Sequence, residues 1–276
     1  MVWYGCKAVL HFLHQQQKDS MKVLVACETS GAVREAFRAK GHEVYSCDIL
    51  PSVDESPWHI QCDAIDVIYS QQWDLLIAHP PCTYLSVSGM HWTTRGLRDP
   101  QLTEDAVEFA KKIFDAPVEK ICIENPVSVL STRIRKPDQI IQPWMFGHDA
   151  SKKTCLWLKG LPELQINKEL IVPPAGWKLV KFADEMQECS DCGEPWCSEH
   201  DMHYSDCECY GPTQDDLQYK TIHGYLFATD KQDSIKPIWA NQTPSGQNKL
   251  GPSKDRWKKR SETYQGIAEA MAACWG

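Results

Sequence analysis

The chain has 276 residues, of which 42% are hydrophobic and 10% aromatic, and its formal net charge is −8. These values fit a folded protein with one large domain, or a domain plus a small insertion, and exclude a disordered chain. The apolar stretch within residues 1–20 is too short and too interrupted to span a membrane or to form a clear secretion signal. We therefore expect no membrane association, a reducing cytoplasmic location, and a frayed extension over residues 1–20 before Met21.

The first 160 residues alternate short apolar runs with amphipathic segments. The expected strands are Lys22–Cys27, His42–Asp48, Asp74–Ala78, Lys120–Glu124 and Cys155–Lys159. The expected helices are Gly31–Lys40, Leu102–Phe114 and, at the end of the chain, Thr263–Ala273, and residues around Asp63 and Val67 are expected to form a third unit of this rhythm. This rhythm predicts an α/β fold with a mostly parallel sheet that helices cover on both faces.

Two regions depart from this rhythm. Between Cys82 and Leu102 lies a long polar loop, SVSGMHWTTRGLRDPQ, which we expect to lack regular structure and to act as a lid or to be disordered. From about Leu164 the alternation is lost. A proline-rich joint, IVPPAG, leads there to a cysteine-rich patch and then to a loose stretch rich in Gly, Asn, Gln and Ser.

The segment DLLIAHPPCTYLS ends a predicted strand in two prolines that precede Cys82. Because Pro80 and Pro81 lack a backbone donor and have a fixed φ, the strand must stop before them. Cys82 then occupies a stiff turn at the carboxyl end of a strand, where ligands bind in open α/β sheets. The alternative is a loop cysteine that packs as a small hydrophobic residue.

Polar residues follow the other predicted strands. Gly31 in ACETSGAV lets the backbone approach a ligand at the start of a helix, which favours nucleotide or carboxylate groups. Asp48 could bind a ribose hydroxyl pair and Asp63 an adenine amine; the alternative for each is a helix cap or a turn residue. Glu124 and Asn125 end another strand, so a carboxylate and Cys82 are expected to face the same crevice.

A dense cluster of soft ligands lies within CSDCGEPWCSEHDMHYSDCECYGP. Its members are Cys189, Cys192, Cys197, His200, His203, Cys207 and Cys209. The CxxC spacing is typical of structural zinc, and the alternative of a redox or disulfide cluster is disfavoured by the reducing location. The expected core is Cys197 with the His203-x3-Cys-x-Cys run, which closes on itself. Cys189 and Cys192 could compete or complete a second site, so the four ligands stay open.

Charge is unevenly distributed. Residues 168–230 hold 13 acidic and 4 basic residues, a local balance of −9. Residues 249–260 hold six basic residues and one acid, a balance of +5. This basic segment contains a tryptophan and is compatible with phosphate binding; the alternative is a solvated tail.

The ordered set ACETSGAVREAF, YSCDI, QCDAI, DLLIAHPPCTYLS and IENP resembles the DNA (cytosine-5)-methyltransferases, over about residues 21–160 and 261–276. FGHDASKKTCLWLKGL is similar to the family's Gly-x-x-Gln-x-Arg-x-Arg motif, and TYQGIAEAMA looks like its final helix. The first loop has one glycine where the family has several, Pro126 replaces the usual valine, and the arginine motif is reduced to Lys152 and Lys153. These departures suggest a compact, divergent branch such as occurs in bacteriophages.

The resemblance implies a Rossmann-like methyltransferase sheet over residues 21–163 and 261–276. A substrate-recognition insertion is then expected over residues 164–260, with the zinc cluster at 189–209. S-adenosylmethionine is the implied methyl donor and DNA the implied partner, in a bacterial or phage-infected cell. The expected cofactor-binding residues are Cys27, Glu28, Ser30, Gly31, Asp48, Ile49, Asp63 and Pro80. The expected DNA-binding residues are Arg95, Arg98, Lys152, Lys254, Arg256, Lys258, Lys259 and Arg260.

The resemblance also implies the chemistry. Cys82 is expected to add to C6 of a flipped cytosine, activated by a thiol pKa lowered by a helix terminus or a cation. Glu124 is expected to hold N3 and the exocyclic amine, and Asn125 to fix either that carboxylate or the Cys82 turn. Residues 87–101 are the expected lid. Two alternatives remain: a non-catalytic DNA- or protein-binding module, and an enzyme that transfers another group to a pyrimidine. The recognised DNA site and the oligomeric state stay open.

Overall fold

The computed structural model describes residues 20–181, 187–188, 195–197, 202–203, 218–229, 236–251, 253 and 256–276. Of the predicted extension over residues 1–20, all but Ser20 lies outside these described residues. The chain divides into two compact units. The first comprises Met1–Pro143, Lys152–Ile166 and Ser253–Gly276, and the second comprises Trp144–Ser151 and Asn167–Pro252. None of the described helices is both long enough and apolar enough to cross a membrane.

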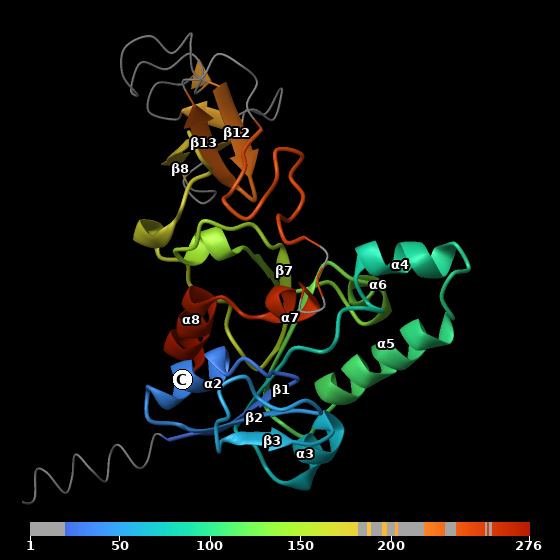
Figure 1. Ribbon diagram of the computed structural model, residues 1–276. Helices are drawn as coiled ribbons and strands as arrows, with labels where there is room; N and C mark the ends of the chain where they lie inside the picture. The colour runs from blue at the N-terminus through green and yellow to red at the C-terminus, as the bar shows by residue number, and fades with distance from the viewer. Residues whose placement is uncertain are drawn as a thin grey trace, which may run out of the picture. The chain divides into compact units, whose positions relative to one another are not determined.

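In the described part of the first unit, seven strands form one sheet in the order β3-β2-β1-β4-β5-β7-β6 (Figure 1). Their bounds are Lys22–Ala26 (β1), Glu43–Asp48 (β2), His59–Gln61 (β3), Leu75–Ala78 (β4), Lys120–Pro126 (β5), Gln139–Ile141 (β6) and Thr154–Lys159 (β7). The strands β1 to β5 pair in parallel, whereas β7 is antiparallel to both β5 and β6. The predicted α/β class with a mostly parallel sheet is therefore confirmed.

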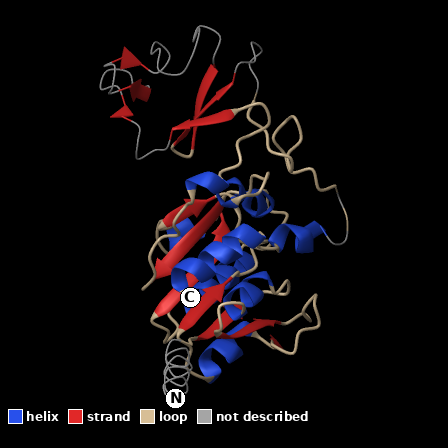
Figure 2. Cartoon of the chain, turned by 90° about the vertical axis from the view of Figure 1, so that its left-hand side faces the viewer, coloured by secondary structure: helices blue, strands red, loops and turns tan. Residues whose placement is uncertain are grey.

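Helices lie on both faces of this sheet (Figure 2). The described helices of the unit are Ala32–Arg38 (α2), Ala64–Ser70 (α3), Val87–Thr94 (α4), Gln101–Phe114 (α5), Leu130–Arg133 (α6), Arg256–Ser261 (α7) and Gln265–Trp275 (α8). α2 packs against α8 on one face, and α3 packs against α5 on the other. The chain thus builds one helical layer from segments near both of its described ends.

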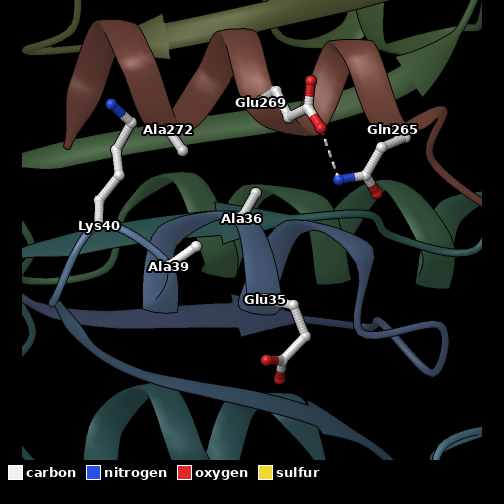
Figure 3. Close-up of a pocket in the computed structure, with 7 residues that line it drawn as sticks. All are labelled: Glu35, Ala36, Ala39, Lys40, Gln265, Glu269 and Ala272. Atoms are coloured by element: carbon white, nitrogen blue, oxygen red, sulfur yellow. Dashed lines mark hydrogen bonds between the residues drawn. The ribbon is translucent and has the colours of Figure 1, made fainter.

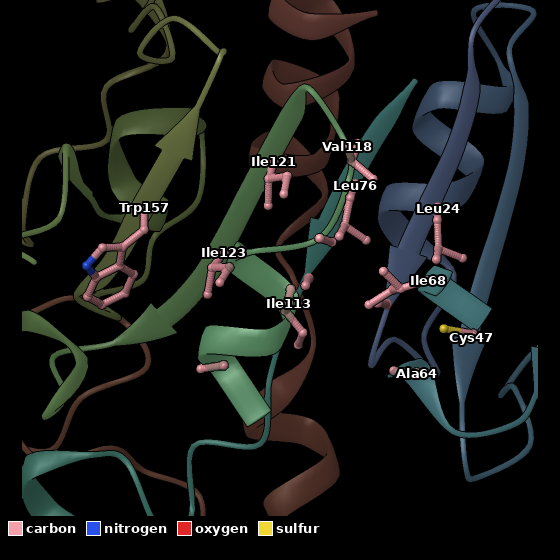
Figure 4. Packing of buried hydrophobic residues seen from close by; sticks show 14 of the residues in the cluster. Leu24, Cys47, Ala64, Ile68, Leu76, Ile113, Val118, Ile121, Ile123 and Trp157 are labelled. Atoms are coloured by element: carbon pink, nitrogen blue, oxygen red, sulfur yellow. The ribbon is translucent and has the colours of Figure 1, made fainter. Parts of the chain in front are cut away.

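Alternate strand residues supply the core on the face of α3 and α5. Leu24, Leu76 and Ile121 are fully buried and belong to one apolar cluster with Ile68 of α3 and Ile113 of α5 (Figure 4). Each such side chain contributes about 1.5–3 kcal/mol through burial. Because the neighbouring strand residues are buried on the opposite face, these strands appear in the sequence as continuous apolar runs.

The expectation that the loop before Leu102 lacks regular structure is wrong. Residues Val87–Thr94 form α4, whose N-cap Ser86 accepts a hydrogen bond from Gly89 N through its side chain. Val87 and Trp92 are exposed, so the helix has no apolar stripe that would reveal it in the sequence. A capping interaction, and not hydrophobic periodicity, marks this helix.

The second unit contains antiparallel strands where the sequence rhythm is lost. Lys178–Lys181 (β8), Gln218–Ile222 (β12) and Tyr225–Thr229 (β13) form a sheet in the order β12-β13-β8. The two residues between β12 and β13, His223 and Gly224, both have positive φ, as a tight two-residue hairpin requires. In the same unit, Trp144 of the short 3₁₀ helix η1 (Pro143–Phe146) stacks on Trp239, with 5.5 Å between the ring centroids, and contacts Phe227 edge-on.

A second small sheet joins Gln187–Glu188 (β9), Pro195–Cys197 (β10) and Met202–His203 (β11). It includes the backbone of two predicted zinc ligands, Cys197 and His203. The other predicted members of the cluster, which are Cys189, Cys192, His200, Cys207 and Cys209, lie outside the described residues. Among the residues that the structure does describe, no group of three or more His, Cys, Asp or Glu side chains could hold a metal ion. The zinc site stays a prediction.

Candidate active site

The carboxyl ends of strands β1 to β5 meet at one edge of the sheet. Ala26 of β1 pairs with Ala78 of β4, which pairs with Ile123 of β5. The chain runs from β1 to β2 and β3 on one side, and then returns to β4 and β5 on the other. A ligand crevice is expected at such a switch in strand order. Residues at or just after these strand ends are spread along this edge, and they are Cys27, Glu28, Asp48, Ile49, Asp63, Pro80, Cys82, Glu124 and Asn125.

Cys82 lies on an exposed turn that follows β4. Its carbonyl accepts hydrogen bonds from Leu85 N at 3.1 Å and from Ser86 N at 2.9 Å. Leu85 O in turn accepts from Val129 N at 2.9 Å, in the segment after β5. The turn is therefore closed on itself and tied to the chain that follows the Glu124 strand.

Asn125 connects the two strand ends directly. Its side chain is 1% exposed, and its Nδ2 donates to Pro80 O at 2.7 Å. This contact fits the second of the two roles considered for Asn125, which is to fix the Cys82 turn. Pro80, expected as a cofactor contact, is itself buried and supplies this acceptor.

The sequence reasoning did not single out His79, although it directly precedes the two prolines. Its Nδ1 lies 3.1 Å from Oε2 of the buried Glu124, and its own side chain is 8% exposed. Its Nε2 is buried and has no hydrogen-bond partner among the described residues. Only the position of His79 at a strand end next to another strand end could have indicated this contact.

The electrostatics of Glu124 favour its ionised form. Burial by itself raises the pKa of this carboxyl, but the hydrogen bond with His79, the charge of Lys152 and a hydrogen bond with Thr154 outweigh that effect. The pKa of Glu124 is therefore lowered, and the side chain is a carboxylate at neutral pH.

The pKa of the Cys82 thiol is raised, so the expectation of a lowered pKa is wrong for the free protein. Partial desolvation by the surrounding protein is the largest cause of this raised pKa even though the residue as a whole is exposed, and the charge of Glu124 acts in the same direction. Lys152 and Arg260 lower the pKa without reversing the shift. The cations that the sequence suggested are present, but desolvation and a neighbouring carboxylate outweigh them.

Glu28, directly after β1, is a buried carboxylate that is only half satisfied by the described residues. The residue is 4% exposed, and its Oε1 accepts from Val33 N at 2.9 Å and from Ser30 Oγ at 3.2 Å. Its Oε2 is buried without a partner in the described part of the chain. The chain bends sharply on both sides of this carboxylate, because Cys27 and Gly31 have φ of 59° and 76°.

The two aspartates at this edge make the local contacts that were considered as alternatives. Asp63 caps α3, where its Oδ1 accepts from Ile65 N at 2.8 Å. Asp48 Oδ1 accepts from Leu50 N at 2.9 Å in the turn after β2. Ile49, which follows Asp48 in this turn, is 68% exposed and presents an apolar surface.

The predicted DNA-binding residues occupy different settings. Arg98 donates to Thr83 O at 2.9 Å and lies over the ring of Tyr84, so it supports the Cys82 turn. Lys152 Nζ donates to Glu262 O at 3.2 Å, and Arg95 ends α4. Arg256 and Arg260 belong to α7. Lys254 and the side chains of Lys258 and Lys259 lie outside the described residues.

A pocket of ≈ 480 Å³ lies between α2 and α8, away from these residues (Figure 3). Its lining consists of Glu35, Ala36, Ala39, Lys40, Gln265, Glu269 and Ala272. Gln265 Nε2 donates to Glu269 Oε1 at 2.9 Å on its α8 side. The pocket contains none of the strand-end residues and is no part of the candidate active site.

Comparison with protein-family models finds no match, and comparison with curated proteins finds none either. Among solved structures, the chain is similar to a candidate DNA modification methyltransferase encoded within a prophage (E. coli), with 14% sequence identity and a TM-score of 0.38. The match covers 62% of this chain and 59% of that chain, so it spans less than two thirds of the other protein's length.

Proposed function

We propose that this protein transfers a methyl group from S-adenosylmethionine to C5 of cytosine in DNA, through a covalent adduct of Cys82 with C6 of a flipped base. The supporting observation is the pairing of an exposed cysteine with a buried carboxylate at adjacent parallel strand ends. The bond from Asn125 to Pro80 holds the two ends together. Cytosine C5 becomes nucleophilic only after a thiolate has added to C6, so this pairing suits the reaction.

The raised pKa of the Cys82 thiol indicates that the target base binds to Glu124 before the sulfur attacks it. Burial and, after it, the charge of the Glu124 carboxylate raise the pKa of Cys82, so engaging that negative charge removes one of the two causes that keep the thiol protonated. A cytosine whose exocyclic amine donates to Glu124 and whose N3 takes up a proton there offsets the negative charge of the carboxylate. The thiol gives up its proton, which balances the proton gained at N3, and the sulfur–C6 bond forms as the ring electrons shift toward N3. After C5 has gained the methyl group, its proton is lost to solvent, the sulfur–C6 bond breaks with its electron pair on sulfur, and the proton on N3 returns to the thiolate, which restores the ring.

The strand-end residues fit S-adenosylmethionine, which supplies the methyl group. The unpartnered Oε2 of Glu28 is a buried acceptor of the kind that an ammonium group would satisfy. Exposed Ile49 offers an apolar surface to an aromatic base. At Gly31 an added Cβ would approach Arg34 Nη2 to 2.3 Å, so the loop around Glu28 is tightly packed. Any residue larger than glycine at position 31 would therefore disturb the loop that holds Glu28.

The basic residues support a nucleic-acid substrate. Lys152 and Arg260 both act on the Cys82 thiol, which puts two positive charges around the nucleophile. Trp92 and Leu97, in and after α4, are exposed apolar side chains beside Arg95. A duplex cytosine must leave its stack to reach a cysteine, and exposed apolar groups with flanking cations suit that step. The Cys/His cluster is proposed to hold structural zinc in the insertion.

Covalent trapping tests the proposal. With a random-sequence duplex library that contains 5-fluorocytosine, methyl transfer leaves no C5 proton to remove, so Cys82 cannot depart. We expect a denaturation-resistant protein–DNA adduct only when S-adenosylmethionine is present, and none with Cys82→Ser. The matched control is Cys62→Ser, which alters an exposed cysteine at another strand end of the same sheet and should still be trapped. An adduct on another cysteine, or no adduct at all, would contradict the proposal.

A further inference from the structure

We infer that His79 is a positioning residue that orients the Glu124 carboxylate toward the target cytosine through a hydrogen bond from Nδ1. The inference rests on the proposed function, in which Glu124 binds the base. Nothing in the sequence resemblance assigns a role to this histidine, which stands three residues before the nucleophile.

The position of His79 follows from strand pairing. Ala78 of β4 pairs with Ile123 of β5, so the next residues, His79 and Glu124, stand side by side where β4 ends. The main-chain N–H of His79 donates to Ala26 O of β1 at 2.9 Å. The ring is thus anchored on β1 through its backbone and contacts β5 through its side chain.

Two hydrogen bonds cross between these strand ends in opposite directions. The side chain of His79 bonds to Glu124 at 3.1 Å, and the side chain of the following residue on β5, Asn125, donates to Pro80 O at 2.7 Å. These two hydrogen bonds therefore connect residues 79–80, which stand shortly before Cys82 in the chain, to residues 124–125. This double connection sets the nucleophile and the base-binding carboxylate in one fixed relation.

The contact orients the carboxylate by hydrogen bonding and does not need a charge on the ring. Nδ1 carries a proton because it faces a carboxylate. A neutral side chain with a donor at the Nδ1 position should therefore replace His79, and one without it should not.

A pair of variants separates these cases. His79→Asn places an amide N–H close to the position of Nδ1, whereas the longer side chain of His79→Gln carries its amide near the position of Nε2. We expect His79→Gln to lower kcat for methyl transfer by about 10–100-fold, the range found when a hydrogen-bond partner that orients a metal-ligating side chain is removed. DNA affinity should stay unchanged because the bond acts on orientation. His79→Asn should recover most of the rate.

A second readout requires no methyl donor. Addition of Cys82 to C6 lets C5 take a deuteron from solvent before its proton leaves, so cytosine H5 should exchange in D₂O without S-adenosylmethionine. His79→Gln should slow this exchange as it slows methyl transfer. In a Glu124→Ala background, which has no acceptor for the His79 bond, the same change should have no further effect, because His79 acts through Glu124. Urea unfolding of every variant checks that all are folded.

The possible failures are distinguishable. If the wild-type protein neither methylates DNA nor forms the fluorocytosine adduct, the proposed function is wrong and the inference fails with it. If the wild-type protein is active and His79→Gln is equally active, the inference alone is overturned. Equal losses in His79→Asn and His79→Gln, or additive losses with Glu124→Ala, would also overturn it, since neither is expected of a donor that acts through the carboxylate.

Discussion

Replacing Glu124 by glutamine should leave the stability of the fold nearly unchanged. The side chain keeps its shape, and its amide oxygen can still accept the bond from His79, but the negative charge is gone. A charge-assisted hydrogen bond contributes about 1.5–3 kcal/mol and a neutral one about 0.5–1.5 kcal/mol. The folded state also no longer carries a buried charge. These terms partly cancel, but the lowered pKa of Glu124 shows that its contacts outweigh the cost of burial, so the variant should lose about 1 kcal/mol or less of the free energy of unfolding at neutral pH.

In the same variant the thiol should become more reactive while catalysis is lost. Because the charge of Glu124 raises the pKa of Cys82, its removal should lower that pKa and speed alkylation of Cys82 by iodoacetamide. Methyl transfer should slow by about 10²–10³, or about 2.7–4 kcal/mol of barrier, the cost of losing one stabilising group for a developing charge. A merely unfolded variant would instead expose all of its cysteines alike.

Peptide mass spectrometry can follow alkylation of Cys82 without DNA, and labelled S-adenosylmethionine can report methyl transfer. The matched control is Glu104→Gln, which removes an exposed carboxylate paired with Arg133 and should change neither rate. If Cys82 alkylation is unchanged or slower in Glu124→Gln, the charge does not act on the thiol as described. If methyl transfer survives, Glu124 does not bind the base.

Three further outcomes are expected. Because the pKa of Glu124 is lowered in the folded state, its ionisation stabilises the fold above the ordinary pKa of 4.5, and this stabilisation is lost as the pH falls through the pKa of the folded state. The difference in urea midpoint between wild type and Glu124→Gln should therefore shrink below pH 4.5, and a constant difference would refute this. Arg34 is fully buried and donates to Ser46 Oγ at 2.7 Å and to the half-exposed Asp54, so Arg34→Met should cost about 1–3 kcal/mol in urea unfolding, with an unchanged midpoint as the contrary result. Elemental analysis of protein purified without chelators should find about one zinc per chain, and its absence would end the zinc prediction.

The parallel strands were predictable because the chain marks them locally. β1, β4 and β5 are buried on both faces, so each is a continuous apolar run, and their ends lie within two residues of the predicted ones. Once the strands are parallel, the residues after them must share one edge. For this reason the order of residues alone is enough to expect Cys82 and Glu124 together.

The rest depends on contacts that no local pattern carries. β8 pairs with β13 through Leu179 and Phe227, which are far apart in the chain, so the small sheet of the second unit has no local signature. The pKa of Cys82 likewise depends on residues that are distant in the sequence. The sequence shows that cations follow in the chain, but it cannot weigh them against shielding from water and against the carboxylate of Glu124.

The packing of α2 against α8 limits how far the protein can fold while it is being synthesised. Arg38, which ends α2, and Gln265, which begins α8, are 227 positions apart (265 − 38). At about 5–20 residues per second, a ribosome needs about 10–45 s to cover that distance. Throughout this interval the surface of α2 that packs against α8 has no covering helix. A nascent chain of this protein therefore cannot complete the packing of α2 until the eleven-residue helix α8 has emerged.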